Sequence, residues 1–330
     1  MKRLSVIIAN YNYERYVSQA IESALALDWP DVEVVVVDDG STDRSREVIA
    51  RYADRVTVIE QENKKQRVAH NEGLAASTGD VVIFLDSDDV LYSALPRAIS
   101  RVWREGVSKV QYQLERIDAA GRPLGSVIPE LGRAPEPAKI RYWIDTTTAY
   151  PTPPCSGNAY ARSFLDHVFP LDESCDDFSD SACLVTAPYF GDVVTIVEPL
   201  GGYRIHEKND SDLLADPSRF GREVRRALWR HRYAYRVAGA RGAPGDESLL
   251  FRGRYVLQLR VAALRLQRGT APLPGDGRWR ALRDTVASPF HPGPEGLKKR
   301  VLIALWCLAV LVSPSSLAHR LVATRFGRGR

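Results

Sequence analysis

Several features that mark common protein classes are missing from this chain of 330 residues. The longest apolar run, residues 301–312, is too short to cross a bilayer, because a spanning helix needs roughly twenty apolar residues. The residues after Met1 lack the apolar stretch and small-residue cleavage site of a secretory signal, so we expect a cytoplasmic protein. The four cysteines form no CxxC pair, which indicates reduced thiols rather than disulfides or a zinc site.

Charge is distributed unevenly along the chain, although the whole carries only +4. Residues 1–215 hold 22 Lys and Arg against 34 Asp and Glu, a net of −12. Residues 216–330 hold 23 against 7, a net of +16. This asymmetry predicts an acidic module suited to metal binding, joined to a basic part that meets an anionic surface. Nucleic acid is disfavoured as that surface, because no stacking aromatics or known binding module accompany the arginines.

Short apolar runs alternate with helical patterns over the first ninety residues. Strands are expected at 4–9, 32–37, 56–60 and 81–85, and helices at 14–27, 41–52 and 68–77, with Ser41 or Thr42 capping the second helix. This order predicts an α/β fold, with a mostly parallel, Rossmann-like sheet flanked by helices. The loop after the first strand has no Gly-rich turn to bind phosphates, which argues against an NAD-dependent enzyme and disfavours a nucleotidyltransferase.

Three polar clusters follow the expected strands, and ligands of parallel sheets bind beyond the carboxyl ends of the strands. They are Asn10-Tyr11-Asn12, Asp38-Asp39-Gly40-Ser41 and Asp86-Ser87-Asp88-Asp89. An aromatic ring in the first could stack on a base, and a carboxylate in the second could bind a base or ribose. Helix capping and turn formation explain the second cluster equally well.

The third cluster carries three carboxylates within four residues. Such carboxylates repel one another unless a cation lies among them. Oxygen ligands suit Mg²⁺ or Mn²⁺, which usually take one or two protein carboxylates and complete their shell with water and substrate phosphates. A solvated turn is the alternative for this cluster considered by itself.

Six segments together resemble the family 2 glycosyltransferases, which are nucleotide-sugar-dependent enzymes of the GT-A fold. SVIIANYN, EVVVVDDGSTDRSREVI, ENKKQRVAHNEGLAASTGD and VVIFLDSDD carry the resemblance strongly over residues 4–92. SGNAYARSFLDHVFPLDES and GDVVTIVEPLGGYRIHEKNDS extend it more weakly to about residue 211. One departure stands out: many relatives carry a Gly where this chain has Lys65.

The resemblance implies roles for particular residues in the donor site. Ala9, Tyr11 and Asp39 would hold the base, most often uracil, and Asp86 would lie near the ribose and the metal. Asp88 would bind a divalent Mn or Mg ion that bridges the diphosphate. In the segment Tyr203-Arg204-Ile205-His206, the resemblance implies that Arg204 contacts phosphate and His206 the metal, although a lone His is more often a packed residue.

The general base is expected near the start of a helix in the second block. Counted back from Gly191, Asp180 best fits the pattern that the resemblance implies, and Asp177 is the alternative. For Asp176 and Asp177, N-capping of the helix is the favoured explanation. The resemblance implies an inverting transfer of a sugar from a nucleotide-diphospho-sugar, most often a UDP-sugar, to a glycan or lipid-linked acceptor. A non-catalytic nucleotide-sugar-binding scaffold and a nucleotidyltransferase are the alternatives.

The sequence suggests three regions: a nucleotide-sugar-binding half at 1–95, an acceptor-binding and catalytic half at 96–215, and a basic, arginine-rich helical extension at 216–330. Within the extension, the apolar segment 301–322 follows Lys298-Lys299-Arg300. Anionic lipids would hold such a segment at an interface, which predicts peripheral attachment to the inner face of the plasma membrane. Packing on the protein's own core or in a dimer is the alternative.

Overall fold

The structure is a computed structural model that describes residues 3–175, 180–206, 213–214, 216–267 and 271–327. The chain divides into two compact units. The first comprises Met1–Ile140 and Pro151–His206, and the second comprises Arg141–Tyr150 and Glu207–Arg330. Each unit is described by itself.

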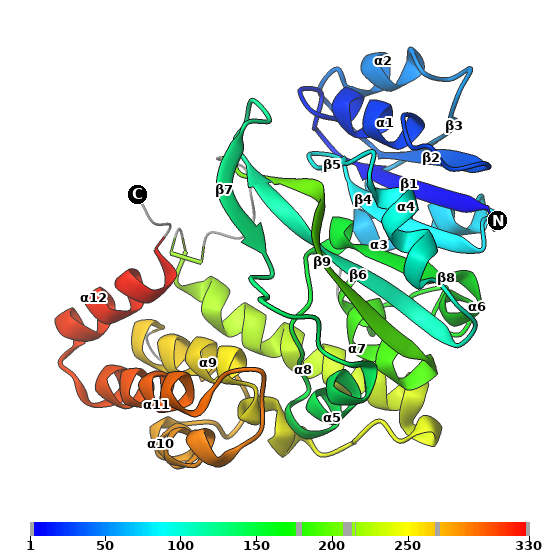
Figure 1. The fold of residues 1–330 in the computed structure, drawn as a ribbon. Helices are drawn as coiled ribbons and strands as arrows, with labels where there is room; N and C mark the ends of the chain where they lie inside the picture. The colour runs from blue at the N-terminus through cyan, green and yellow to red at the C-terminus, as the bar shows by residue number, and fades with distance from the viewer. Residues whose placement is uncertain (1–2, 176–179, 207–212, 215, 268–270, 328–330) are drawn as a thin grey trace. The chain divides into compact units, whose positions relative to one another are not determined.

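A single mixed sheet organises the first unit (Figure 1). Its strands follow the order β3-β2-β1-β4-β8-β6-β9-β5, and β7 pairs with β6 outside this path. The strands are β1 (Leu4–Asn10), β2 (Val32–Asp39), β3 (Thr57–Gln61), β4 (Val81–Asp86), β5 (Val90–Leu91), β6 (Val107–Ile117), β7 (Pro123–Ile128), β8 (Asn158–Ala161) and β9 (Asp192–Arg204).

The four N-terminal strands are parallel neighbours, as the alternating pattern predicts. β1 pairs with β2 and with β4, and β2 pairs with β3, all in parallel register. Such strands are buried on both faces, which explains the continuous apolar runs at 6–8 and 81–85. The predicted α/β fold with a mostly parallel sheet is therefore confirmed.

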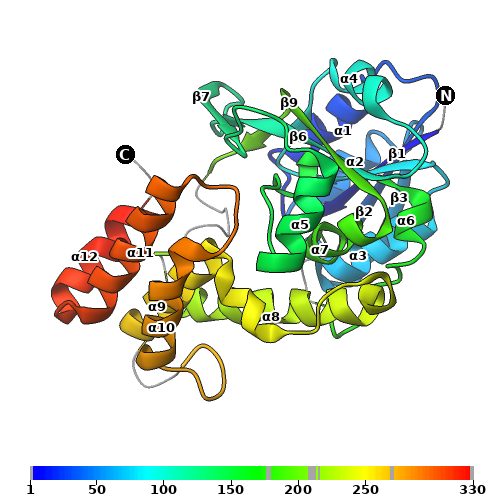
Figure 2. The same cartoon turned by 60° about the horizontal axis from the view of Figure 1, so that its bottom comes forward.

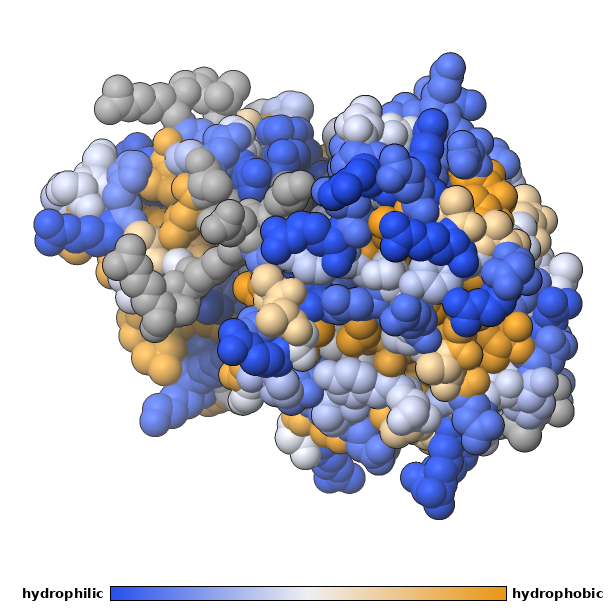
Figure 3. Space-filling model, turned by 90° about the horizontal axis from the view of Figure 1, so that it is seen from above, coloured by the Kyte–Doolittle hydropathy of each residue, from blue (hydrophilic) through white to orange (hydrophobic). Residues whose placement is uncertain are grey.

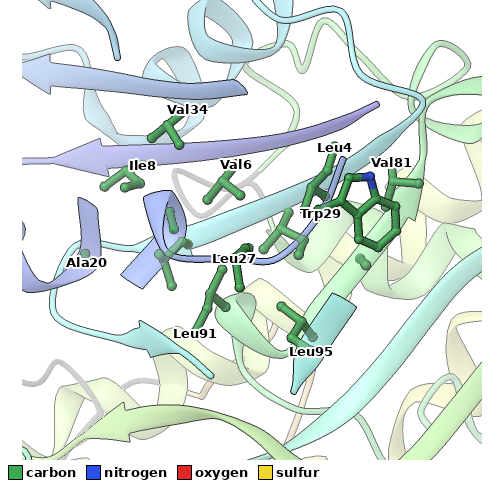
Figure 4. Close-up of a cluster of buried hydrophobic side chains, with 14 of the residues drawn as sticks. Leu4, Val6, Ile8, Ala20, Leu27, Trp29, Val34, Val81, Leu91 and Leu95 are labelled. Atoms are coloured by element: carbon green, nitrogen blue, oxygen red, sulfur yellow. The ribbon is translucent and has the colours of Figure 1, made fainter. Parts of the chain in front are cut away.

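Helices cover this sheet. They are α1 (Val17–Leu25), α2 (Ser45–Ala50), α3 (Lys65–Ala75), α4 (Leu95–Val102), α6 (Arg162–Leu165) and α7 (Asp180–Phe190), with the 3₁₀ turn η1 at Cys155–Gly157. α1 buries Val17, Ala20, Ile21 and Ala24, which recur at helical spacing. These residues join apolar side chains of β1, β2 and β4 in the core cluster drawn in Figure 4.

The second unit is helical (Figure 2). It contains α8 (Ser218–Ala238), η2 (Gly239–Arg241), η3 (Glu247–Arg252), α9 (Arg254–Leu266), α10 (Arg278–Ala287), η4 (Ser288–Phe290), α11 (Leu297–Val312) and α12 (Ser315–Phe326), and it takes in α5 (Pro137–Thr147) from Arg141 onward. The predicted C-terminal helical extension is present. Its core gathers apolar residues of α8, α9, α11 and α12.

One local prediction was wrong. Neither Ser41 nor Thr42 caps the helix after β2, which begins at Ser45; the amide of Ser45 instead donates to the Asp43 carboxylate. In the second unit, η3 and α9 are separated at Gly253, whose backbone is extended. A Cβ at Gly253 would come within 2.9 Å of the Thr147 carbonyl oxygen, so close backbone packing requires glycine there.

None of the helices in the described part of the chain is long and apolar enough to cross a membrane. The apolar segment at 301–322 instead forms most of α11 and α12, which are separated at Ser313-Pro314. On the face drawn in Figure 3, hydrophilic side chains predominate, and hydrophobic ones form small groups among them.

Candidate functional site

The three polar clusters meet at one edge of the sheet. In the β1–β2 register Asn10 lies opposite Asp38, and in the β1–β4 register Ala9 lies opposite Asp86. Because these strands are parallel, their carboxyl ends lie together. The loops that follow β1, β2 and β4 therefore border a common site.

Asn12 ties the first loop to the second. Its side-chain oxygen accepts hydrogen bonds from the amides of Thr42 and Asp43, at 2.7 and 3.2 Å, and its own amide donates to Ser41 Oγ. Its φ of 61° lies in the left-handed region, where Asn is tolerated better than most residues. The neighbouring Tyr11 is 43% exposed, so its ring is accessible for stacking.

The two carboxylates at the end of β2 have different environments. Asp38 is fully buried and accepts from Asn10 Nδ2 and Arg46 Nε, both at 3.0 Å. Asp39 accepts from Gln61 Nε2 at 2.6 Å and from the Lys64 amide at 2.8 Å through one oxygen, Oδ1. Asp38 therefore holds the loops together, which supports Asp39 as the ligand-binding member of the pair.

The three carboxylates after β4 also separate into different environments. Asp89 is buried: one oxygen accepts from Ser156 Oγ at 2.6 Å, and the other accepts from the Arg204 amide at 2.9 Å. Burial, followed by the charge of Asp88, raises the pKa of Asp89 well above its usual value. Asp86 and Asp88 are only partly buried, which leaves these two as the accessible carboxylates of the cluster.

Ser156 links this loop to the 3₁₀ turn that precedes β8. Its hydroxyl accepts from the Asp86 amide at 3.1 Å while donating to Asp89. The following Gly157 has no room for a side chain, since a Cβ there would lie 2.5 Å from Pro153. Asn158 accepts from the buried Lys109 Nζ at 3.0 Å. The sequence singled out Ser156 and Gly157 only by resemblance, and nothing in it revealed the contact with Asp89.

Arg204 is 1% exposed, and its side chain binds the acidic loop, Asp86-Ser87-Asp88-Asp89. Its Nε donates to the Asp88 carbonyl oxygen at 2.6 Å, and its Nη2 donates to Gln19 Oε1 at 2.8 Å. Its guanidinium carbon lies 4.9 Å from the centre of the Tyr16 ring, close enough for a cation–π contact. The phosphate contact implied for Arg204 stays a prediction, whereas the structure shows this side chain engaged with the loop itself.

His206 lies beside Asp88, with 2.9 Å between His206 Nε2 and Asp88 Oδ2. The imidazole stacks on the Tyr16 ring at 5.0 Å and meets the edge of the Tyr13 ring at 5.9 Å. Burial and then the charges of Asp88 and its acidic neighbours raise the pKa of the Tyr13 phenol. The sequence-predicted pair Asp88 and His206 is thus brought together in a strongly negative environment.

The residues around this pair fit a divalent cation. Among the described residues, no three His, Cys, Asp or Glu side chains converge as a complete metal site. Mg²⁺ and Mn²⁺ are nevertheless commonly held by one or two side chains, with phosphate oxygens and water as the other ligands. A carboxylate oxygen and an imidazole nitrogen 2.9 Å apart are suitable protein donors for such a shared shell.

The base predicted from the sequence is Asp180. Asp180 begins α7, but its side chain lies outside the described residues, as do Asp176 and Asp177 entirely. The role of Asp180 therefore stays a prediction.

The sequence of the chain matches the family model described as glycosyl transferase family 2, over residues 5–169. The chain belongs to this family. A putative glycosyltransferase, EpsH, of Bacillus subtilis is 28% identical over 213 residues, 62% of this chain and 61% of that protein. An uncharacterized glycosyltransferase of a Nostoc species is 38% identical over 214 residues, 63% of this chain and 66% of that protein. The match thus covers less than two thirds of either family relative.

Solved structures show the same fold as this family 2 chain. TarS 1-349 of S. aureus, in complex with UDP-GlcNAc, is 17% identical with a TM-score of 0.56, and the match covers 96% of this chain and 92% of that one. The mannosyltransferase PcManGT from Pyrobaculum calidifontis, in complex with GDP-Man and Mn²⁺, is 18% identical with a TM-score of 0.53, covering 98% and 84%. The fold is therefore that of the GT-A glycosyltransferases.

Proposed function

We propose that this protein transfers a sugar from a nucleotide-diphospho-sugar, a UDP-sugar first among the candidates, to a hydroxyl group of a glycan or lipid-linked acceptor. The observation that carries the proposal is the pairing of Asp88 with His206 at the edge where β1, β2 and β4 end. A site that combines a predicted base-binding edge with a group of acidic side chains suits a nucleotide whose diphosphate is bound together with a cation.

The donor residues divide along the loops. Tyr11 would stack on the base, Asp39 would accept hydrogen bonds from it, and Ala9 would leave room for it beside β1. Asp86, which lies opposite Ala9 in the register, would face the ribose. Gln66 Nε2 donates to Asp86 Oδ1 at 3.2 Å, so this carboxylate already has a fixed direction before donor binds.

Asp88 and His206 would hold the divalent ion, Mn²⁺ or Mg²⁺. When bound, that ion supplies positive charge to the diphosphate leaving group. Arg204 acts here as a positioning residue, because its guanidinium binds the backbone of Asp88. Its contacts fix the loop, so that Asp88 meets His206 without a further rearrangement.

The acceptor side of the reaction requires a base. Asp180 would take the proton from the acceptor hydroxyl as its oxygen attacks the anomeric carbon. Attack from the side opposite the nucleotide inverts the configuration at that carbon, and the nucleoside diphosphate leaves with the electron pair of the broken bond. Asp180 is the first residue of α7.

The acceptor would lie at a membrane. We place the protein peripherally on the inner face of the plasma membrane, where lipid-linked glycans of the cell surface are assembled. The basic composition of residues 216–330 supports this location, since such a segment is attracted to anionic lipids.

A donor panel tests the proposal. Purified protein is given UDP- and GDP-sugars with Mn²⁺ and a membrane extract as acceptor, and the released nucleoside diphosphate is measured. We expect release with one donor class that depends on the extract. Asp180→Asn should abolish transfer while donor binding persists; unchanged transfer would move the base to Asp177. Donor binding without any release across the panel would favour a binding scaffold over an enzyme.

A further inference from the structure

The helix α11 (Leu297–Val312) has an inner face that is packed within its own unit. Its buried residues Ile303, Ala304, Cys307, Val310 and Leu311 face one side of the helix and join the core of the second unit. The alternative that this segment packs on the protein's own core therefore holds for one face of the helix. It does not account for the opposite face.

The outer face of α11 is apolar and exposed. Its side chains are Leu297, Val301, Leu302, Leu305 and Val312, which are 66%, 40%, 56%, 56% and 71% exposed. Their spacing places them on one side of an α-helix, opposite the buried set. No polar residue occurs from Val301 to Val312. Helices that are apolar all round are normally covered on both faces, so this face calls for a partner.

Two exposed aromatic residues belong to elements that pack against α11. Phe290, in η4, is 85% exposed, and Trp279, in the first turn of α10, is 83% exposed. Aromatic side chains of this kind are enriched where proteins meet the interfacial region of a bilayer. They indicate that this region meets the interfacial region of a bilayer rather than the core of another protein.

The charge of the segment discriminates between a membrane and a second copy of the chain. Residues 297–330 contain seven Lys and Arg and no Asp or Glu. Lys298 and Lys299 are exposed in the first turn of α11, and Arg320 is exposed on α12. A second copy docked on this face would bring two such cationic segments together, whereas an anionic surface complements them.

The length of α11 determines how it meets that surface. Sixteen residues extend about 24 Å, less than the ~30 Å thickness of a bilayer core. We propose that the outer face of α11 lies in the plane of an anionic lipid bilayer, with Leu302 and Leu305 inserted among the acyl chains and Lys298 and Lys299 on the headgroups. This proposal rests on the proposed membrane location, and it names the residues that would contact the lipid.

Vesicle co-sedimentation of the full-length protein tests the proposal without donor, acceptor or metal. Wild-type protein should bind vesicles of phosphatidylcholine and phosphatidylglycerol in equal parts, bind phosphatidylcholine alone poorly, and dissociate as salt is raised. Because no sugar chemistry is involved, failure here leaves the donor assignment intact, and failure of donor turnover leaves this binding intact.

Two double variants separate the apolar and the charged contributions. Leu302→Gln with Leu305→Gln should weaken binding to anionic vesicles by roughly tenfold or more, because two inserted side chains become polar. Lys298→Ala with Lys299→Ala should weaken it by roughly thirtyfold, at about 1 kcal/mol for each lysine. All four side chains are exposed, so the folded protein should tolerate both changes.

Matched controls lie in the first unit. Leu124→Gln changes an exposed leucine of β7 in the same way, and Arg97→Ala with Arg101→Ala removes two exposed cations from α4; both should bind like the wild type. Vesicle binding by Leu302→Gln with Leu305→Gln that equals the wild type would overturn the proposal. So would a wild-type dimer, seen by sedimentation velocity, that this double variant converts to a monomer, because a second copy would then cover the face.

Discussion

Asp88 and His206 are separated by 118 positions in the chain, yet Asp88 Oδ2 and His206 Nε2 are 2.9 Å apart. The short strand β5 explains how they meet. It begins two residues after Asp88, and Val90 pairs with Gly202 of β9, four residues before His206. This strand pairing therefore brings the imidazole of His206 next to Asp88.

Replacing either member of this pair should weaken divalent-ion binding strongly. We expect Asp88→Asn and His206→Gln each to reduce the affinity for Mn²⁺ in the presence of UDP by roughly 100-fold or more, since even residues outside the ligand shell cost 10–100-fold. Calorimetric titration of Mn²⁺ measures this, and nucleotide release should fall in parallel. Asp192→Asn, in an ion pair between exposed side chains, is the control and should bind Mn²⁺ normally. Wild-type affinity in both site variants would remove the metal assignment.

Ser156→Ala should destabilise the protein and disturb the site together. The variant removes the hydroxyl that donates to the buried Asp89 and accepts from the Asp86 amide. We expect a loss of about 1–3 kcal/mol in the free energy of unfolding, as for other buried polar groups left without a partner. Urea denaturation measures the change, and the KM for donor should rise because Asp86 belongs to the same loop. Ser93→Ala, at an exposed position of the same region, should leave both quantities unaltered.

Lys65→Gly should preserve or increase stability. Lys65 has a φ of 74°, in the left-handed region that favours glycine. Removing the side chain relieves strain of roughly 1 kcal/mol, partly offset by the flexibility of glycine in the unfolded chain. Thermal unfolding of the variant should therefore occur at or above the wild-type temperature. Lys65→Val, which is β-branched, should unfold at a lower temperature.

Glu33→Gln should have an effect on stability that depends on pH. Burial by itself raises the pKa of Glu33, but hydrogen bonds from the Ser5 hydroxyl and from the Thr78 and Gly79 amides outweigh it, so the net pKa is lowered. A lowered pKa in the folded state stabilises the protein above the unfolded-state pKa, and this contribution disappears as the pH falls through the folded-state value.

The variant should accordingly lose about 1.5–3 kcal/mol near neutral pH, as expected for hydrogen bonds to a charged group. The difference in the free energy of unfolding between the wild type and Glu33→Gln should decrease below about pH 4. Urea denaturation at a series of pH values tests this, with the exposed Glu60→Gln as control. A deficit that stayed constant from neutral to acid pH would show that the charge of Glu33 contributes nothing.

Much of the donor half of the fold could be predicted because it is local. The apolar runs of β1, β2 and β4 are buried on both faces, and the polar clusters begin where those runs end. The family match confirms the family that these segments indicated. Boundaries were less accurate: α2 begins at Ser45 rather than at residue 41, because Ser41 binds Asn10 and Asn12 instead of a helix end.

The roles within the acidic loop could not be predicted. Three neighbouring carboxylates look equivalent in the sequence, yet Asp89 is buried against Ser156 and Arg204 while Asp88 meets His206. Ser156 lies in η1, Arg204 ends β9 and His206 follows β9, so all three partners are remote from the acidic loop in the chain. The hydrogen bond from Arg204 to the Asp88 carbonyl oxygen was not predicted either, and the phosphate contact of Arg204 stays a prediction.

The sequence by itself determined the parallel sheet, the family and the edge at which the polar clusters lie. These features depend on residues that are consecutive in the chain: the apolar runs that form buried strands and the polar residues of the loops that follow them. Only the tertiary structure decided which carboxylate faces outward and which face of α11 is left uncovered. Both depend on contacts between distant segments, and a linear pattern records that a residue is acidic or apolar, not what packs against it.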